Sequence, residues 1–521
     1  MGPELLPGTL TVTAATSDAA ATLSVNGIAI ASGARSAPIP VPAGKSVATI
    51  AVVARDKTTR KTYTILLDRR LRGQEAFLKS PKVEALTLLG SSLAISGDTL
   101  AVGGEAADGR MGSSGVVHVF VRRGNAWAQQ ALLPSPNPRR QDGFGSSLAI
   151  EGDTLVVGAP TVACSPARAQ PVPANGIDDG CGAVYVFVRQ GERWSLQAQL
   201  MAPDGAMADY FGMSVALSGE TVVVGAHGQD GPDPRKPSAG RLSDSGAAYV
   251  FVRRGVTWTQ QACLRSASAS EGGQFGGGLA LDGNTLAVSG SEPAGDRQGE
   301  RAPPGSPGSR KGIVHVFVRT GDLWFEQARL SGARHRLGTR PAISGGTLVV
   351  DGEEVGDAGP RGEGRPNGEG ATEGPAIFVF VRTGTEWGPP TTLRSPGAQR
   401  ELFGASVAIA GDTIVVGAPP WESADTADTA DATDTPRAGR PESETRTGGA
   451  YLFLRSGAVW SAPVYLQSSR PGLHEGFGLS VAISRDTVVI GDEGDSSGAA
   501  PGAASGPDDA AFLSGAVYVF R

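Results

Sequence analysis

The chain has 521 residues, with 46 Lys and Arg against 52 Asp and Glu, and a formal net charge of −6 at pH 7. This balance leaves no basic surface for nucleic acid, and no apolar run approaches the ~20 residues that a membrane-spanning helix needs. We therefore expect neither a nucleic-acid partner nor a transmembrane segment. The 75 glycines and 36 prolines fit a loop-rich all-β chain, and its length suits two domains.

Residues Thr9–Asp68 alternate apolar and polar positions in the manner of β-strands. Asn26-Gly27, between apolar residues, is a strong hairpin signal. The segments SVNGIAIASG and VATIAVVARD resemble the C-terminal part of a cadherin-like bacterial β-sandwich module, which implies a partial module over residues 1–70. Its opening strands are missing, and the segment Met1–Leu10 lacks the charged and apolar regions of a signal peptide. We therefore expect the full gene to begin earlier.

The stretch Phe144–Leu200 is the unit that the chain repeats. It contains four apolar runs of strand length separated by turns, which predicts a four-stranded antiparallel meander. We name its strands A, B, C and D. Turns that carry Gly, Asp or Pro separate its four apolar runs, which are Ser147–Ile150, Thr154–Val157, Ala183–Val188 and Trp194–Leu200.

The same order of signals occurs seven times. The copies open at Leu89, Phe144, Phe211, Phe275, Leu337, Phe403 and Phe477, each followed by glycine. Strand C is a nearly continuous apolar run in every copy, as expected for a strand covered on both faces. Because a lone sheet cannot bury both faces, the copies must pack on one another, and β repeats of this size indicate a propeller. We predict an all-β fold, with a seven-bladed β-propeller over residues 74–521 and a small N-terminal β-sandwich-like module.

Two short motifs recur at the start of strand A and the end of strand B. Phe144-Gly145, followed by Gly158-Ala159-Pro160, resembles the FG-GAP repeat of integrin alpha-subunit propellers and of many bacterial secreted proteins. This resemblance implies a secreted or cell-surface protein that acts in adhesion by binding an extracellular protein or glycan. Three copies depart from the second motif and carry Gly103-Gly104-Glu105, Ser289-Gly290-Ser291 and Asp351-Gly352-Glu353.

The last copy ends at Arg521, directly after strand C, and so lacks a strand D. A spare segment, Gln74–Ser80, precedes the first copy, and its Ala76 and Leu78 match the Ala and Leu positions of strand D elsewhere. We predict that this segment closes the last blade beside strand C at Ala516–Phe520.

The turn between strands A and B is short in every copy. Integrin-type repeats place a calcium loop here, with several oxygen-bearing side chains, because Ca²⁺ takes six to eight oxygen ligands. Each turn in this chain offers about one carboxylate, such as Asp153 or Asp412. We therefore expect tight structural turns, and no metal or other cofactor.

The three cysteines do not form a disulfide scaffold. Cys164 and Cys181 stand at the two mouths of one hairpin, the loop between strands B and C of the second copy, where a disulfide can form. We predict this bond; two buried free thiols are the alternative. Cys263, in strand D of the third copy, is interpreted as a small core residue.

The loops between strands B and C differ most among the copies. Because strands alternate in direction, these loops share one face of the ring with the loops between D and A, and we expect binding on that face. We interpret Asp425–Asp434 as a solvated low-complexity tract and Asn175–Asp179 as a turn-rich loop. The longest of these loops are Gly228–Ser245, Glu292–Lys311, Gly352–Gly374, Pro420–Gly448 and Asp492–Ser514.

The sequence contains no nucleophile elbow, Gly-rich phosphate loop or Cys/His pair. His118 and His315 occupy a strand C position that tyrosine holds in other copies, which indicates packing, and His335 and His474 fall in loops between D and A. We therefore predict a non-enzymatic, monomeric binding propeller with no catalytic, cofactor or metal residues. Two alternatives stay open: a propeller-scaffold hydrolase or lyase with an axial active site, and a structural spacer of a larger surface protein.

Overall fold

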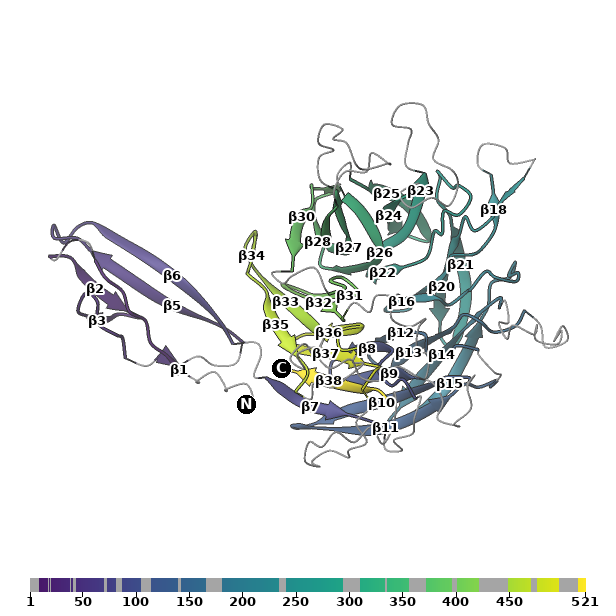
Figure 1. Cartoon of the computed structure of the whole chain (residues 1–521), viewed down its shortest axis with the longest axis horizontal. Coiled ribbons are helices and arrows are strands. Elements are labelled where there is room, and N and C mark those ends of the chain that lie inside the picture. Colours follow the sequence, from purple (N-terminus) through teal and green to yellow (C-terminus); the bar gives the residue numbers. More distant parts are fainter. Residues whose placement is uncertain are drawn as a thin grey trace, which may run out of the picture. The chain divides into compact units, whose positions relative to one another are not determined.

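The computed structural model describes most of the chain, and every regular element within it is a β-strand (Figure 1). None of the described residues forms a helix that could span a membrane. The chain divides into two compact units, Met1–Glu75 with Phe520–Arg521, and Ala76–Val519. The described residues are 9–16, 18, 20–37, 39–40, 44–69, 73–80, 87–104, 114–138, 142–164, 180–233, 240–293, 310–332, 335–355, 372–395, 401–420, 448–469, 476–495 and 514–521.

The first unit contains a short ribbon and a four-stranded antiparallel sheet. The ribbon pairs β1 (Thr9–Leu10) with β4 (Ile39–Pro40). Asn26 and Gly27 have φ of 48° and 80°, and this left-handed pair makes the predicted hairpin between β2 and β3. The sheet has the order β3 (Ile28–Ile30), β2 (Thr22–Val25), β5 (Gly44–Val53), β6 (Arg60–Arg69).

The described residues of the second unit form seven antiparallel sheets of four or five strands and a separate two-stranded ribbon. Six of the seven sheets are each built from one copy of the repeat, and the last also takes a strand from before the first copy. The first three are β8 (Ser92–Ser96), β9 (Thr99–Gly104), β10 (Val116–Arg123), β11 (Ala126–Pro134); β12 (Ser147–Glu151), β13 (Thr154–Ala159), β14 (Ala183–Gln190), β15 (Arg193–Leu200); and β16 (Ser214–Ser218), β17 (Thr221–Ala226), β20 (Ala247–Arg254), β21 (Thr257–Leu264). The next two are β22 (Leu279–Asp282), β23 (Thr285–Pro293), β24 (Arg310–Thr320), β25 (Leu323–Leu330); and β26 (His335–Ser344), β27 (Thr347–Val355), β28 (Thr372–Thr383), β29 (Glu386–Trp387), β30 (Thr391–Arg394). The last two are β31 (Ser406–Ala410), β32 (Thr413–Ala418), β33 (Gly449–Ser456), β34 (Val459–Trp460), β35 (Val464–Gln467); and β36 (Ser480–Ser484), β37 (Thr487–Asp492), β38 (Ala516–Phe520), β7 (Gln74–Leu78).

The seven sheets surround a common centre, with strand A innermost (Figure 1). Each strand A contacts the next one, from β8 through β12, β16, β22, β26 and β31 to β36, which contacts β8 again. Strands B and C are buried on both faces, so neighbouring sheets share their hydrophobic cores. The all-β propeller that the repeat predicts is therefore confirmed.

The two recurrent motifs hold neighbouring sheets together. Gly145 N–H donates to the carbonyl of Gly158 in the same sheet at 2.9 Å, while Ser92 Oγ of the preceding sheet donates to the carbonyl of Gly145 at 2.6 Å. The Phe144 ring packs edge-to-face on Tyr185 of strand C, with 5.5 Å between centroids. The same serine-to-carbonyl bond is made by Ser147, Ser214 and Ser406, and Ser480 Oγ donates to the carbonyl of Gly90 where the last sheet meets the first.

The last sheet takes its outer strand from the segment that precedes the first copy. Its strand order is β36, β37, β38, β7. Phe77 packs edge-to-face on Tyr518, and Leu78 is buried in the core shared with the first sheet. Beyond β7, Lys79 Nζ lies 2.7 Å from Asp495 Oδ1 and 2.7 Å from Ser514 Oγ, and the side chains of the ion pair are each 3% exposed.

Two sheets depart from the predicted four-strand pattern. Strand D is split into β29 and β30 in the fifth sheet, and into β34 and β35 in the sixth. Pro389-Pro390 and Pro463 stand at these breaks, because proline has no N–H to donate to a ladder. The prediction that His335 lies in a loop is wrong, since β26 starts at this residue and pairs it with Glu354.

Candidate functional site

Loops and turns separate onto the two faces of the ring. Phe144 N–H, between strand D and the next strand A, donates to the carbonyl of Ser114 at the end of a B to C loop. On the other side, Arg122 N–H donates to the carbonyl of Asp98 in the A to B turn. We call the side that carries the B to C and D to A loops the loop face, and the side that carries the A to B turns the turn face.

The turn face is held together by an arginine of strand C. Arg189 Nε lies 2.6 Å from Asp153 Oδ1 in the A to B turn, and Nη1 donates to Thr99 Oγ1 of the preceding sheet at 2.9 Å. The guanidinium also lies over Trp194, 5.3 Å from the ring centroid. The same contact, between a strand C arginine and the Trp that follows it, is made in five other sheets. The pairs are Arg122 with Trp127, Arg253 with Trp258, Arg319 with Trp324, Arg382 with Trp387 and Arg455 with Trp460. In the first, second, third and sixth sheets a turn carboxylate therefore serves as the counter-ion of this arginine, whereas Arg319 of the fourth sheet donates to the Asn284 side chain.

Calcium is expected to leave the stability of the protein unchanged. Asp153 and Asp412 each bond to an arginine, and the described residues contain no group of three or more His, Cys, Asp or Glu that could hold a metal. Thermal melts in millimolar Ca²⁺ and in chelator should therefore overlay. A large rise in melting temperature with Ca²⁺ would show that the turns bind the ion.

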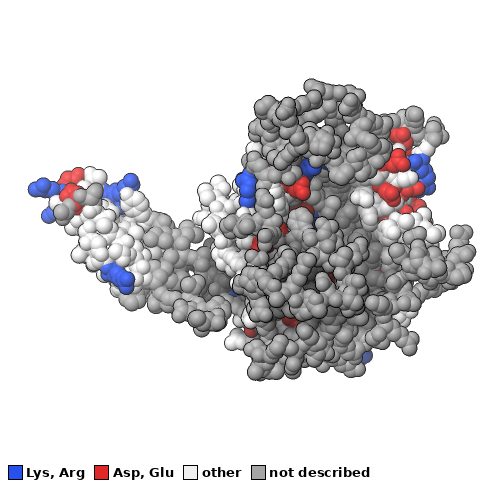
Figure 2. All heavy atoms as spheres, viewed as in Figure 1, with Lys and Arg blue, Asp and Glu red and all other residues white. Residues whose placement is uncertain are grey.

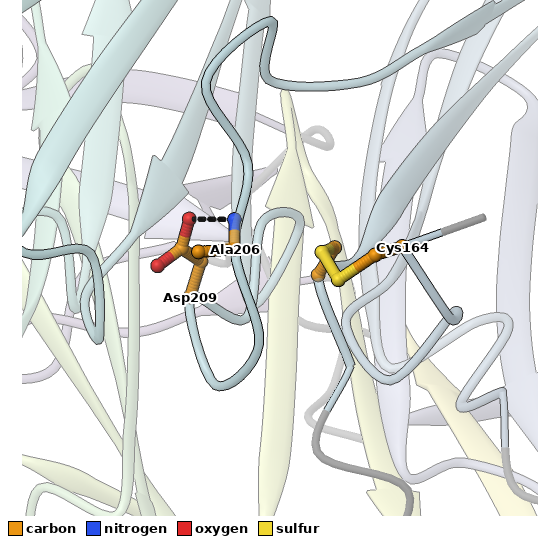
Figure 3. The surroundings of a disulfide bond; sticks show 4 residues. Cys164, Ala206 and Asp209 are labelled. Atoms are coloured by element: carbon orange, nitrogen blue, oxygen red, sulfur yellow. Dashed lines mark hydrogen bonds between the residues drawn. A yellow bond between two sulfur atoms is a disulfide. The ribbon is translucent and has the colours of Figure 1, made fainter. Parts of the chain in front are cut away.

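A disulfide fixes the loop face of the second sheet. Cys164 and Cys181 are joined, with 4.8 Å between their Cα atoms, and Gly182 N–H donates to the carbonyl of Val162 in the same loop (Figure 3). The carbonyl of Cys181 accepts from Phe211 N–H, the residue that opens the third sheet. The bond thus stiffens the surface on which the next D to A loop rests.

We expect this disulfide in protein purified from an oxidising compartment, where it should contribute ~3 kcal/mol by constraining the unfolded chain. Mass mapping of non-reduced peptides should recover the linked Cys164 and Cys181 peptides. Recovery of both residues as alkylated thiols from such a preparation would rule the bond out.

The D to A loop of the third sheet carries a polar cluster. Asp204 accepts from the Tyr249 hydroxyl at 2.7 Å and from Gln229 Nε2 at 2.9 Å, and Arg265 Nη2 lies 3.6 Å from its carboxylate. In the same loop Asp209 accepts from Ala206 N–H at 2.7 Å (Figure 3). Burial raises the pKa of Asp209, and the bond from Ala206 opposes that shift.

The described part of the B to C loop of the third sheet contains two short paired strands. Its strands are β18 (Gly231–Pro232) and β19 (Arg241–Leu242), and Arg241 Nη2 donates to the carbonyl of Asp230 at 2.8 Å. Figure 2 shows acidic and basic side chains close together at this rim. The rim therefore offers paired charges rather than a patch of one sign.

A second polar group lies at the loop end of the fourth sheet. Glu292 contacts Lys311 Nζ at 3.2 Å and Arg329 Nη2 at 2.8 Å. His315 Nδ1 lies 2.6 Å from Glu326 Oε1, and its ring packs edge-to-face on Phe275. These residues line or surround a small cavity between the third and fourth sheets.

The other residues that the sequence singles out have varied surroundings. His118 is buried in strand C, and burial lowers its pKa, which fits the predicted packing role. The prediction that Cys263 is a core residue is wrong: it is exposed, because β21 is the outermost strand of its sheet. The segments Asn175–Asp179 and Asp425–Asp434, and His474, lie outside the described residues.

The contacts that make the loop face polar are not predicted by any sequence motif. Ser268 and Arg329 carry no motif, and their role depends on which loop of one sheet meets which strand of the next. The recurrence of tyrosine in strand C is the signal that could have located them, since His315 interrupts it.

Comparison with known families finds two matches. The FG-GAP repeat matches residues 127–187, 194–251 and 393–434, and a cadherin-like β-sandwich domain matches residues 8–70. No curated protein shows significant similarity to the chain.

Two solved structures are distant matches. The first is the β-propeller domain of the Trilobed protease from Pyrococcus furiosus, at 11% identity and a TM-score of 0.35, with 88% of this chain and 97% of that chain covered. The second is an acylaminoacyl peptidase in complex with a chloromethyl ketone, at 9% identity and a TM-score of 0.36, with 86% of this chain and 54% of that chain covered. From the matched residues and the observed sheets, the protein contains FG-GAP repeats in an all-β propeller, preceded by a cadherin-like β-sandwich domain.

Proposed function

We propose that the protein is a non-enzymatic, monomeric binding propeller, secreted or at the cell surface, which takes part in adhesion by recognising an extracellular protein or glycan through its loop face. One observation carries this proposal: the two faces use their polar residues differently. On the turn face, the recurrent Arg, Asp and Thr side chains bond to one another between sheets, as Arg189 does to Asp153 and Thr99. On the loop face, the polar contacts of the third and fourth sheets differ from each other, and the loops differ in length along the sequence, as expected for recognition.

The arrangement of ionisable groups favours binding over catalysis. His315 Nδ1 lies 2.6 Å from Glu326 Oε1, the contact that a histidine base makes with an orienting carboxylate. Among the described residues, however, no hydroxyl or thiol donates to this imidazole. A hydrolase that uses such a pair needs a nucleophile within hydrogen-bond reach of the ring. The disulfide on the loop face supports an oxidising compartment.

Exchange of two loops should weaken binding strongly. Residues Gly231–Leu242 and residues 356–371 would each be replaced by a short Gly-Ser turn, which leaves Gln229 and its bond to Asp204 in place. Retention of the protein on a glycan array and on immobilised extracellular proteins would then be measured. We expect binding to fall by about tenfold or more, since interface loops commonly hold the few residues that dominate affinity.

Two controls distinguish the faces and the units. Substituting Arg254, whose side chain is exposed at the turn face, by serine should leave binding unchanged. Deleting residues 1–68 should also leave it unchanged. Full binding by the loop-exchanged protein, together with loss on deleting residues 1–68, would place the site in the first unit and refute the proposal.

A further inference from the structure

A small polar cavity lies on the loop face between the third and fourth sheets. Its volume is about 10 Å³, which is room for one water-sized group. It is partly enclosed, and much of its lining is polar, from Ser245, Ser266, Ser268, Ser291, Glu292 and His315.

The cavity arises from two shortened side chains at one position of the repeat. In the third sheet, the strand C residue Tyr249 reaches Asp204, which stands four residues after the buried Leu200 of the preceding strand D. In the fourth sheet the corresponding residues are His315 and Ser268. Tyr451 and Glu401 repeat the tyrosine–carboxylate contact in the sixth sheet, at 2.8 Å. In the third sheet the long pair fills this space, whereas the shorter His315 and Ser268 of the fourth sheet line the cavity.

The lining is rich in hydrogen-bonding groups, and its charged groups are already paired with one another or with neighbouring residues. Glu292 is held by Lys311 and Arg329, and Glu326 accepts from His315 Nδ1. The hydroxyl groups of Ser266 and Ser268 lie 3.1 Å apart, and Arg329 Nη2 donates to Ser268 Oγ. Because a hydroxyl both donates and accepts, such a lining suits a neutral hydroxyl group better than an ion.

We propose that this cavity receives one hydroxyl group of a neutral glycan bound on the loop face. The inference rests on the proposed binding function and narrows its partner from protein or glycan to a neutral glycan. The cavity is too small for a whole sugar ring, so it selects the position and orientation of a single substituent, while the surrounding loops contact the rest of the ligand.

The repeat itself supplies the variant that closes the cavity. The double substitution His315→Tyr and Ser268→Asp recreates the pair of the third sheet, where both side chains fit the same backbone. His315→Tyr is the second variant, since tyrosine is buried at this position in four other sheets. His118→Tyr, in the first sheet, is the matched control because it makes the same change away from the cavity.

Wild type and the three variants would be applied to an array of neutral and acidic glycans, with melting temperatures recorded for each. We expect wild type and His118→Tyr to bind neutral glycans, and both cavity variants to bind them about tenfold or more weakly at an unchanged melting temperature, the loss that one or two buried hydrogen bonds produce.

Binding of neutral glycans by both cavity variants at the wild-type level would overturn the inference. If the loop exchanges still weaken binding in that case, the proposed function stands and only the cavity assignment fails. Wild-type binding restricted to acidic glycans or to proteins would overturn the neutral-glycan inference in the same way. If neither the loop exchanges nor the cavity variants weakened binding, both the proposed function and the cavity assignment would be overturned.

Discussion

Replacing Lys79 by methionine is expected to lower the free energy of unfolding by about 3–5 kcal/mol, the usual cost of removing one partner of a buried ion pair. Its ammonium lies 2.7 Å from the Asp495 carboxylate, and both side chains are 3% exposed. Asp495 also accepts from the Tyr518 hydroxyl at 3.2 Å, so the pair ties the segment after β7 to strand C of the last sheet. The shift in the midpoint of urea unfolding measures the effect.

Arg254→Met is the control for this substitution. Arg254 lies 3.9 Å from Asp322, and both side chains are more than three-quarters exposed, so water screens the pair and its loss should change the midpoint little. Equal midpoints for the Lys79 and Arg254 variants would show that the buried ammonium does not hold the last sheet together.

Gly158→Ala is expected to destabilise the protein by about 3 kcal/mol, at the upper end of ordinary overpacking costs. A Cβ at Gly158 would overlap the carbonyl oxygen of Gly212 in the next sheet and the hydroxyl of Ser147. The hydroxyl donates to that carbonyl at 2.7 Å, so the added methyl must either break this bond or push the sheets apart. Urea unfolding followed by tryptophan fluorescence measures the loss.

Gly240→Ala is the matched control, because a Cβ there meets no atom within 4 Å. Its effect should lie within about 0.5 kcal/mol, as for most surface substitutions. If Gly158→Ala were equally harmless, the close approach of neighbouring sheets at this motif would be refuted.

Much of the propeller could be predicted from the sequence because each strand has a local signal. The strand boundaries follow from apolar runs, and the FG and GAP glycines mark backbones that touch. The fourth copy shows why the motif can change: Ser289 replaces the strand B glycine, while Gly278 replaces the strand A serine. Ser289 Oγ then donates to the carbonyl of Thr339 in the next sheet, so the hydroxyl changes strand and the bond between sheets persists.

The features that required the structure are those that join distant parts of the chain. Arg189 bonds to Thr99 of another sheet, and the cavity beside His315 depends on Ser268 of the preceding loop. These pairs follow from how the sheets pack, and no spacing within one copy encodes them. The exposure of Cys263 has a similar cause, since β21 has a neighbouring strand on only one side.

Amide hydrogen exchange of the segment Gln74–Leu78 tests the claim that the strand preceding the first copy completes the last sheet of the ring. Strands inside a sheet exchange only when the sheet opens, whereas an unpaired segment exchanges at once. We predict protection of β7 comparable with that of β11 and β15, the outer strands of the first two sheets. Exchange of Gln74–Leu78 at the rate of an unstructured peptide, while β38 stays protected, would contradict the claim.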